Sequence, residues 1–234
     1  ADPAIARVFA QIGFDFLTID MEHCAFNPET LQQVLLAFEG TKTCPIVRVP
    51  WHEPVWTKWA LDFGAEGIMV PNVLTAEETA QAVSNCTYPP EGTRGYFPRV
   101  SSNFLFNLSE YMDGVNQRIV TWVQIEHIDA IKNLDAILKT PGLDAIFIGP
   151  ADLSSSMGIL NQFDDPHFLD TLQHIIDKAR QAGMPVAYQF SSYQDALFDR
   201  LREGVQIYSY NFDWLFALQG AAQFLKEVKE KLGV

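Results

Sequence analysis

The stretch IFIGPADLSSSMG, residues 146–158, holds the unit from which this chain is built. Residues 145–148 form a short apolar run that predicts a buried strand, and Gly149-Pro150 ends the run because proline cannot continue a strand. An acid, Asp152, stands within three residues of that stop, and Ser154 to Ser156 follow as a predicted polar loop. The pattern is that of a strand that delivers an acid to one edge of a sheet.

The same unit of an apolar strand, a polar loop and a capped helix recurs along the chain. Short runs rich in β-branched or aromatic residues predict seven strands, at 14–20, 44–50, 67–71, 119–126, 145–149, 185–190 and 206–211. Helices are predicted to begin at Asp2-Pro3, Asn27-Pro28, Glu53-Pro54 and Thr75, and to cover 129–138, 166–182, 193–203 and about 214–232. Because the strands lack the alternation of a half-exposed sheet, we expect a parallel sheet covered by helices.

This order of elements predicts an α/β fold, a TIM (β/α)8 barrel made by a single domain over residues 1–234. Such a barrel has eight strands. Seven are predicted here, so we expect the first strand to lie upstream of residue 1, or another segment to close the sheet. No Gly-x-Gly-x-x-Gly motif follows a strand, which argues against a dinucleotide-binding fold. One irregular stretch, 86–117, exceeds the usual loop length and is typical of a functional loop.

The composition excludes several classes of function. The 234 residues are 48% hydrophobic and 19% charged, and no apolar run approaches the ~18 residues of a membrane span. A net charge of −13 repels nucleic acid and anionic lipid, so we expect a soluble protein that binds neither. Three cysteines without C-x-x-C spacing argue against a disulfide framework or a zinc cluster, which leaves the cytoplasm as the expected compartment.

Charged and polar residues stand where the predicted strands end, and in a barrel these ends meet at one rim. The residues at the rim are Asp20, Glu22, His23, Arg48, Gln124, Glu126 and Asp152. Two carboxylates without a neighbouring lysine repel each other unless a cation or a proton joins them. Glu126 and Asp152 therefore predict a site for a hard divalent ion such as Mg²⁺ or Mn²⁺.

Each of these residues also has an ordinary structural interpretation. Asp152 alone is typical of a helix N-cap or an Asx turn, and Glu126 of a solvated acid in the first turn of a helix. Arg48 suits a bidentate substrate carboxylate, or else an internal ion pair with Asp20. His23 suits acid–base catalysis near neutral pH, or is simply polar surface. The metal interpretation rests on the residues taken together.

The lysines bear on how a carbonyl group would be activated. All eight, at positions 42, 58, 132, 139, 178, 226, 229 and 231, fall in predicted helices or loops. A Schiff-base aldolase needs a buried, desolvated lysine inside the barrel. Activation of a keto group would therefore fall to a metal ion acting as a Lewis acid.

Several stretches together resemble the HpcH/HpaI aldolase family in order and spacing, over roughly residues 1–185. They are Asp20-Met-Glu-His23, Arg48-Val-Pro50, Gly64-Ala-Glu-Gly-Ile-Met-Val-Pro71, Tyr88-Pro-Pro-x-Gly-x-Arg-Gly95, Gln124-Ile-Glu126, and Gly149-Pro-Ala-Asp-Leu-Ser154 with Met157-Gly158. The resemblance implies a class II pyruvate aldolase of the 2,4-dihydroxyhept-2-ene-1,7-dioate or 2-dehydro-3-deoxyglucarate type, on a barrel of the phosphoenolpyruvate/pyruvate type. It also implies a homo-oligomer, a hexamer or a dimer or trimer within one, that exchanges its C-terminal helix.

The resemblance further implies roles for single residues. Glu126 and Asp152 look like ligands of a divalent metal, with Co²⁺ as a candidate after Mg²⁺ and Mn²⁺. Arg48 looks like the group that holds the keto acid, and His23 like the acid–base residue. The remaining groups implied around the metal and the substrate are Asp20, Glu22, Gln124 and the backbone of Gly149, Pro150, Ala151 and Asp152.

Asp62 is the one implied catalytic residue that the predicted fold does not bring to the rim. Family members pair it with the histidine that matches His23. It stands at the far end of its predicted helix, about 15 Å from the rim. We therefore expect Asp62 to reach His23 of a neighbouring subunit, or to have no role.

The predicted reaction makes or breaks a C–C bond through a pyruvate enolate. The expected substrates are a 2-keto acid and an acceptor aldehyde or keto acid, and the aromatic residues within 188–190 and 208–214 are expected to shape the acceptor pocket. A citrate-forming transferase acting on oxaloacetate and acetyl-CoA, and an oxaloacetate decarboxylase, would use the same enolate. A barrel that binds a keto acid without turnover is the alternative outside the enzymes.

Overall fold

One parallel sheet forms the centre of the molecule. The computed structural model describes residues 2–190, 202 and 204–233. In this part of the chain seven strands pair in chain order, each parallel to the next: β1 (Phe16–Asp20), β2 (Cys44–Arg48), β3 (Gly67–Val70), β4 (Val120–Ile125), β5 (Ala145–Ile148), β6 (Val186–Phe190) and β7 (Ile207–Tyr210). The seven predicted strands and their parallel arrangement are confirmed, each within two residues of its predicted limits.

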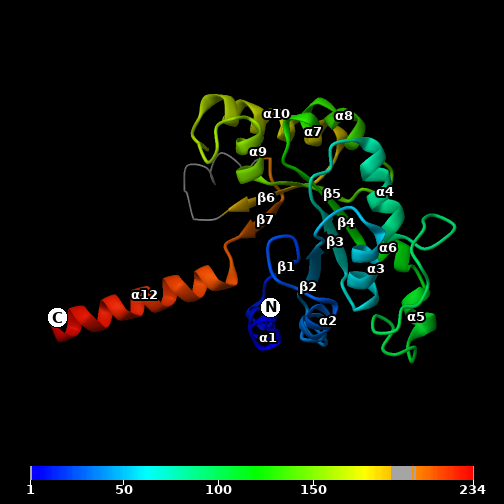
Figure 1. Cartoon of the computed structure of the whole chain (residues 1–234), viewed down its shortest axis with the longest axis horizontal. Coiled ribbons are helices and arrows are strands. Elements are labelled where there is room, and N and C mark those ends of the chain that lie inside the picture. The colour runs from blue at the N-terminus through cyan, green and yellow to red at the C-terminus, as the bar shows by residue number, and fades with distance from the viewer. Residues whose placement is uncertain (1, 191–201, 203, 234) are drawn as a thin grey trace.

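Helices connect the strands and surround them (Figure 1). They are α1 (Pro3–Ile12), α2 (Pro28–Leu36), α3 (Pro54–Asp62), α4 (Ala76–Cys86), α5 (Leu108–Met112), α6 (Val115–Arg118), α7 (Ile128–Lys132), α8 (Leu134–Ile137), α9 (Pro150–Ser156), α10 (Pro166–Ala182) and α12 (Asp213–Leu232). The predicted caps are present: Asp2 accepts the amides of Ala4 and Ile5, and Thr75 forms a capping box with Glu78.

Three local predictions differ from the structure. The helix expected over 129–138 is two helices, because Asn133 leaves helical geometry and donates its side-chain amide to the Leu74 carbonyl at 2.8 Å. The stretch 86–117 is not wholly irregular, since it holds α5 and the start of α6. Ser154 to Ser156 are helical rather than loop, because Pro150 starts α9. The helix predicted over 193–203 lies outside the described residues, apart from position 202.

The two faces of the sheet carry two separate apolar clusters. The larger cluster packs the helices against one face, with buried side chains such as Leu31, Leu61, Leu134 and Phe168. The smaller cluster lies on the other face and joins Phe16 and Ile46 to Met69, Trp122, Ala145, Phe147 and Ala187. The sheet therefore has an outer, helix-covered face and an inner face filled by its own side chains.

The inner cluster shows that the sheet is strongly curved. Strands β1 and β4 are separated by two others, so in a flat sheet they would lie about 14 Å apart. The rings of Phe16 on β1 and Trp122 on β4 nevertheless meet edge to face with centroids 5.4 Å apart. The seven strands thus form a half-barrel, in which β1 and β7 are the two edges in the described part of the chain.

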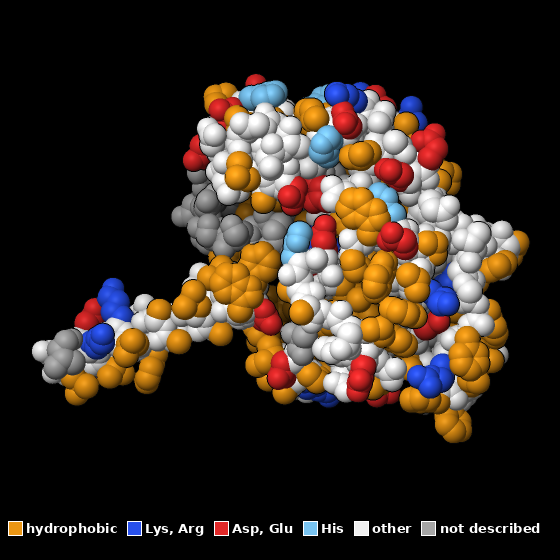
Figure 2. Space-filling model, in the orientation of Figure 1, with side chains coloured by type: hydrophobic (Ala, Val, Ile, Leu, Met, Phe, Trp, Pro, Cys, Tyr) orange, Lys and Arg blue, Asp and Glu red, His pale blue; other side chains and the backbone are white. Residues whose placement is uncertain are grey.

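Helix α12 stands apart from the rest of the fold. It projects away from the body in Figure 1, and hydrophobic side chains run along one side of it in Figure 2. None of its residues is buried. Within the described part of the chain its first turns meet the body, where the Phe216 ring lies 5.8 Å from the Phe9 ring of α1. None of the helices among the described residues is both long enough and apolar enough to cross a membrane.

Candidate active site at the carboxyl ends of the strands

The inner face of the sheet changes from apolar to polar toward the carboxyl ends of the strands. Successive side chains on a strand point to opposite faces, so Trp122 and Gln124 of β4 share the inner face, and Glu126 continues the same row beyond the strand. In β2 the inner row runs from Ile46 to Arg48, the last residue of the strand. Neighbouring strands therefore place charged and amide groups directly above an apolar layer.

Arg48 is held by two acids from the end of β1. Its Nε and Nη2 donate to the two carboxylate oxygens of Asp20 at 2.9 and 2.7 Å, and its Nη1 lies 3.1 Å from Glu22 Oε2. Burial alone would raise the pKa of Asp20, but the hydrogen bond and charge of Arg48, together with the backbone N–H groups of Glu22 and His23, lower the pKa of that carboxyl overall. The internal ion pair considered for Arg48 is thus present, and it fixes the guanidinium at the rim.

Glu126 is a buried acid with two hydrogen-bond donors. It is 3% exposed, Oε1 accepts the backbone N–H of Asn72 at 2.7 Å, and Oε2 accepts Nε2 of Gln124 at 2.8 Å. Burial raises the pKa of Glu126 to about 7, with further contributions from the charges of Glu22 and Asp152. The interpretation of Glu126 as a solvated surface acid is therefore wrong.

Asp152 lies in the first turn of α9, from which its charge acts on Glu126. Gly149 rather than Asp152 is the N-cap of this helix, and the helix has no side-chain capping bond, so the capping interpretation of Asp152 is wrong as well. The Asp152 side chain is exposed, yet its charge raises the pKa of both Glu126 and Glu22. Asp152 is therefore accessible to solvent, and its negative charge still acts on the buried carboxylate of Glu126.

The absence of a side chain at Gly149 leaves room for the carboxylate of Glu126 and the amide of Gln124. A Cβ atom at this position would lie 2.5 Å from Glu126 Oε2 and 3.3 Å from Gln124 Nε2, so a larger residue would displace the carboxylate. The two residues that follow, Pro150 and Ala151, form the start of α9. Gly149 is buried against Glu126, whereas Ala151 and Asp152 are exposed at the start of the helix.

The donor set of this region suits a hard divalent cation. Glu126 and Asp152 supply carboxylate oxygens, and Gln124 Oε1 is buried without a hydrogen-bond partner in the described part of the chain. No three His, Cys, Asp or Glu side chains among residues 2–190, 202 and 204–233 are grouped to hold a metal on their own. A two-carboxylate site of this kind fits Mg²⁺ or Mn²⁺, which keep waters or substrate oxygens as further ligands.

His23 and Asp62 are not brought together within the chain. His23 follows β1, its side chain is 62% exposed, and its Nε2 lies 3.7 Å from Glu22 Oε2. Asp62 ends α3, where Oδ1 accepts Nη2 of the fully buried Arg94 at 3.1 Å. Among the described residues the structure records no contact between the two, as expected from the position of Asp62 at the far end of its helix.

Three polar groups of the inner face were missed at the level of sequence. Thr18 lies between Phe16 and Asp20 on β1, and its hydroxyl is buried without a partner among the described residues. Ser209 of β7 donates to Gln189 of β6 at 2.7 Å, and both follow inner-face residues at a spacing of two. The spacing of two residues from apolar inner-face positions could have identified these polar groups, although the strands as a whole are apolar.

The aromatic residues of the last two strands do not line the inner face, contrary to expectation. Tyr188 and Phe190 belong to the cluster under the helices, and Tyr208 stacks on Phe190 from the same side. Gln189 and Ser209 point inward instead. The acceptor side of the site is therefore more polar than the sequence suggested.

Two further predictions about residue types are confirmed. All eight lysines lie outside the strands. The three cysteines, Cys24, Cys44 and Cys86, are free thiols.

Known proteins match both the sequence and the fold. The family model for HpcH/HpaI aldolase/citrate lyase matches residues 1–219. The chain is 40% identical over 185 residues to 5-keto-4-deoxy-D-glucarate aldolase of Salmonella arizonae, which covers 79% of this chain and 72% of that protein. A crystal structure of an HpcH/HpaI aldolase/citrate lyase family protein from Burkholderia cenocepacia aligns with a TM-score of 0.89 and 30% identity, over 97% of this chain and 91% of that one. The citrate synthase SbnG aligns with a TM-score of 0.84 and 30% identity, over 98% and 90%.

Proposed function

Because this chain belongs to the HpcH/HpaI aldolase/citrate lyase family and is a carbon–carbon lyase, we propose that it is a divalent-metal-dependent aldolase acting on a 2-keto acid. The observation that carries this proposal is the pairing of buried Glu126 with Asp152 beside the fixed guanidinium of Arg48. Such a site can hold a cation and an anionic substrate together at the end of the sheet.

Glu126 and Asp152 would hold the metal, which is Mg²⁺ or Mn²⁺ in this proposal, with Co²⁺ as a third candidate. A bound ion supplies Lewis-acid polarisation of the substrate keto group. Arg48 faces the keto-acid oxygens and stabilises negative charge that develops there. Gln124, Pro150 and the backbone from Gly149 to Asp152 complete the site for the keto acid.

The cleavage step breaks the bond between C3 and C4 of the 2-keto acid. The electron pair of that bond moves to C3 and gives the enolate of pyruvate. The C4 hydroxyl loses its proton to His23, and C4 leaves as an aldehyde carbonyl. Protonation of the enolate at C3 then gives pyruvate, and the reverse sequence forms the bond. The exposed imidazole of His23, which lies beside Glu22, is the group of the rim that would take this proton and return it.

We propose a polyhydroxylated 2-keto acid as the natural substrate. This rests on the 40% identity to 5-keto-4-deoxy-D-glucarate aldolase, and on the inward Gln189 and Ser209, whose amide and hydroxyl can bind substrate hydroxyl groups. The similarity to citrate synthase SbnG makes a citrate-forming transferase the second candidate. Oxaloacetate decarboxylation would use the same enolate.

The assembly is part of the proposal. Exposed apolar residues of α12, namely Trp214, Leu218, Phe224, Leu225 and Leu232, make this helix suited to packing on another copy. We propose a homo-oligomer in which α12 is exchanged and Asp62 of one copy approaches His23 of the next.

We also propose that residues 1–234 form one domain of a TIM barrel, whose eighth strand would lie between β7 and β1. The free thiols support the cytoplasm as its location.

Product analysis tests the proposed reaction. The purified protein is incubated with Mg²⁺ or Mn²⁺ and 5-keto-4-deoxy-D-glucarate, and separately with oxaloacetate, with and without acetyl-CoA. We expect pyruvate and an aldehyde from the sugar acid, and EDTA should abolish both products. If citrate forms only with acetyl-CoA and the sugar acid is not cleaved, the protein is a citrate-forming transferase and the aldolase proposal is wrong. Absence of any product from a folded, metal-loaded sample would contradict both.

A further inference from the structure

His52 contacts the backbone of the next strand end rather than the substrate side of the rim. It lies between Arg48, the last residue of β2, and the start of α3. Its Nε2 is 2.6 Å from the carbonyl oxygen of Pro71, and its ring stacks on Trp51 with centroids 5.0 Å apart. A carbonyl oxygen only accepts hydrogen bonds, so His52 must carry its proton on Nε2 and donate it.

The carbonyl that His52 binds belongs to the same peptide group that binds Glu126. The carbonyl oxygen of Pro71 and the N–H of Asn72 are the two ends of one planar amide, and the N–H donates to Glu126 Oε1 at 2.7 Å. In a trans peptide these two groups point in opposite directions. The hydrogen bonds thus run in series from the imidazole, through one rigid amide, to the buried carboxylate.

The 71–72 peptide has an uncommon backbone conformation, which the hydrogen bond from His52 stabilises. Asn72 has a φ of 50°, in the left-handed region that residues other than glycine seldom adopt. A hydrogen bond to the carbonyl side of the peptide opposes rotation of its plane. It also polarises the amide, which strengthens the N–H as a donor to a carboxylate.

We propose that His52 is a positioning residue, which aims the 71–72 peptide at Glu126 and so holds one oxygen of the carboxylate that would bind the metal. This inference rests on the proposed function. His52 acts through the peptide, and Glu126 remains the group that acts on the site. Outer contacts of this kind set the orientation of a ligand and commonly change metal affinity by 10–100-fold, as a rough range.

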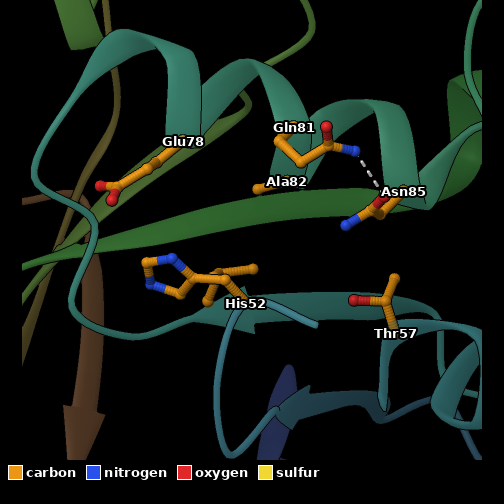
Figure 3. A pocket seen from close by; sticks show the side chains of 7 residues that line it. His52, Thr57, Glu78, Gln81, Ala82 and Asn85 are labelled. Carbon is orange, nitrogen blue, oxygen red and sulfur yellow. Dashed lines mark hydrogen bonds between the residues drawn. The ribbon is translucent and has the colours of Figure 1, made fainter. Parts of the chain in front are cut away.

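The space around His52 allows the idea to be tested without large disruption. The imidazole borders a pocket between α3 and α4 of about 80 Å³, lined also by Thr57, Glu78, Gln81 and Asn85. Figure 3 shows the ring below α4, on the side of the pocket toward Glu78 and away from Thr57. The pocket has room for a few water molecules but not for a sugar acid. A phenyl ring in place of the imidazole therefore keeps the packing and removes the donor.

Binding of Mn²⁺ to the substrate-free protein provides the readout, followed by electron paramagnetic resonance of the free ion. We expect His52→Phe to weaken Mn²⁺ affinity by about tenfold, and His52→Gln, whose amide nitrogen can reach the same carbonyl, to restore most of it. Thr57→Val is the matched control, since it changes the same pocket without touching Pro71, and its affinity should equal that of the wild type. Amide exchange of the peptide that spans residues 68–74 should speed up in His52→Phe alone.

The outcomes separate this inference from the proposed function. If the wild type fails to bind Mn²⁺, the metal-dependent function itself is contradicted. If the wild type binds Mn²⁺ and Glu126→Gln does not, while His52→Phe binds as tightly as the wild type, the role of His52 is overturned. Equal weakening in His52→Phe and His52→Gln also overturns it, because the donor would then not be what matters. Should His52→Phe not fold, His52→Leu takes its place in the same comparison.

Discussion

The rim of the sheet and helix α12 are opposite kinds of surface on one chain. At the rim the charged groups find partners nearby: Asp20 holds Arg48 with two hydrogen bonds, and Glu126 accepts two donors. Helix α12 has twenty residues and not one of them is buried, although Trp214, Leu218 and Leu225 lie along one side. The groups of the rim that would bind the metal and the substrate thus have partners in their own chain, whereas α12 exposes apolar area that a folded protein usually covers.

This difference teaches that binding of the reactants and assembly are separable in this fold. The groups that would hold a cation and a keto acid are fixed by short strands and one glycine, all within one chain. The groups that we propose to act between copies are the exposed helix α12 and the Asp62–His23 pair, whose two members do not meet within the described part of the chain. Changes in the groups that would hold the metal should therefore affect its binding with little effect on assembly, and changes in α12 should affect assembly with little effect on metal binding.

The largest expected effect is that of Glu126→Gln. The substitution keeps the shape and removes the charge, so we expect kcat/KM for 2-keto-acid cleavage to fall by at least about a hundredfold. The oligomeric mass should stay the same, because Glu126 is an interior group of the rim. Steady-state kinetics and light scattering measure the two quantities. Glu77→Gln, an exposed acid on α4, is the control that should change neither.

Gly149→Ala should have a smaller but still clear effect on the rim. The added methyl would stand 2.5 Å from Glu126 Oε2, and this forces the carboxylate to move. We expect a loss of about tenfold or more in kcat/KM, with the oligomer intact. Gly95→Ala is the matched control, since its nearest neighbour would be Lys58 at an ordinary 3.4 Å. Full activity of Gly149→Ala would mean that this clearance does not matter.

The double substitution Trp214→Ser and Leu218→Ser tests the other half of the contrast. Both residues are more than half exposed, so the monomer gains or loses little stability of its own. If α12 packs on a second copy, the mass in solution should fall and Mn²⁺ binding should persist. An unchanged mass would show that these residues of α12 are not needed for contacts between copies. A fall in mass with loss of Mn²⁺ binding would contradict the separation of the two surfaces.

The smallest expected effect is the pH dependence of the free energy of unfolding of the metal-free protein. Burial raises the pKa of Glu126 from its ordinary 4.5 to about 7, so the folded state binds this proton more tightly than the unfolded chain. The free energy of unfolding should fall as pH rises from about 4.5 to about 7, by up to about 1.4 kcal/mol per pH unit, and level off above. Denaturant titrations in EDTA measure the slope. Glu126→Gln should lack this contribution; an identical slope would rule Glu126 out as its source.

Much of the fold could be predicted because its signals are local. Asp2, Asn27 and Thr75 cap helices through contacts within a few residues, and each strand is a short apolar run with a clear stop. The break at Asn133 was missed because its side chain bonds a carbonyl 59 residues away. No local pattern carries such a contact.

The positions of the candidate residues at the strand ends could be predicted, but their orientations and contacts could not. Asp20, Arg48, Glu126 and Asp152 could be placed at one rim because each stands where a strand ends. The orientation of Tyr188 could not be predicted while the strand was treated as uniformly apolar, since a shift of one residue exchanges the two faces. The Asn72 N–H that binds Glu126 is a backbone group, so no side-chain pattern marks it.

The most direct test of the central claim is deuterium exchange at the methyl group of pyruvate. Wild-type protein is incubated with pyruvate and Mg²⁺ or Mn²⁺ in D₂O and followed by proton NMR, without any aldehyde. The account predicts metal-dependent loss of the methyl signal, abolished by EDTA and by Glu126→Gln, and retained in Gly95→Ala. A folded wild-type sample that exchanges no proton with either metal, or a Glu126→Gln variant that exchanges as fast as the wild type, would contradict it.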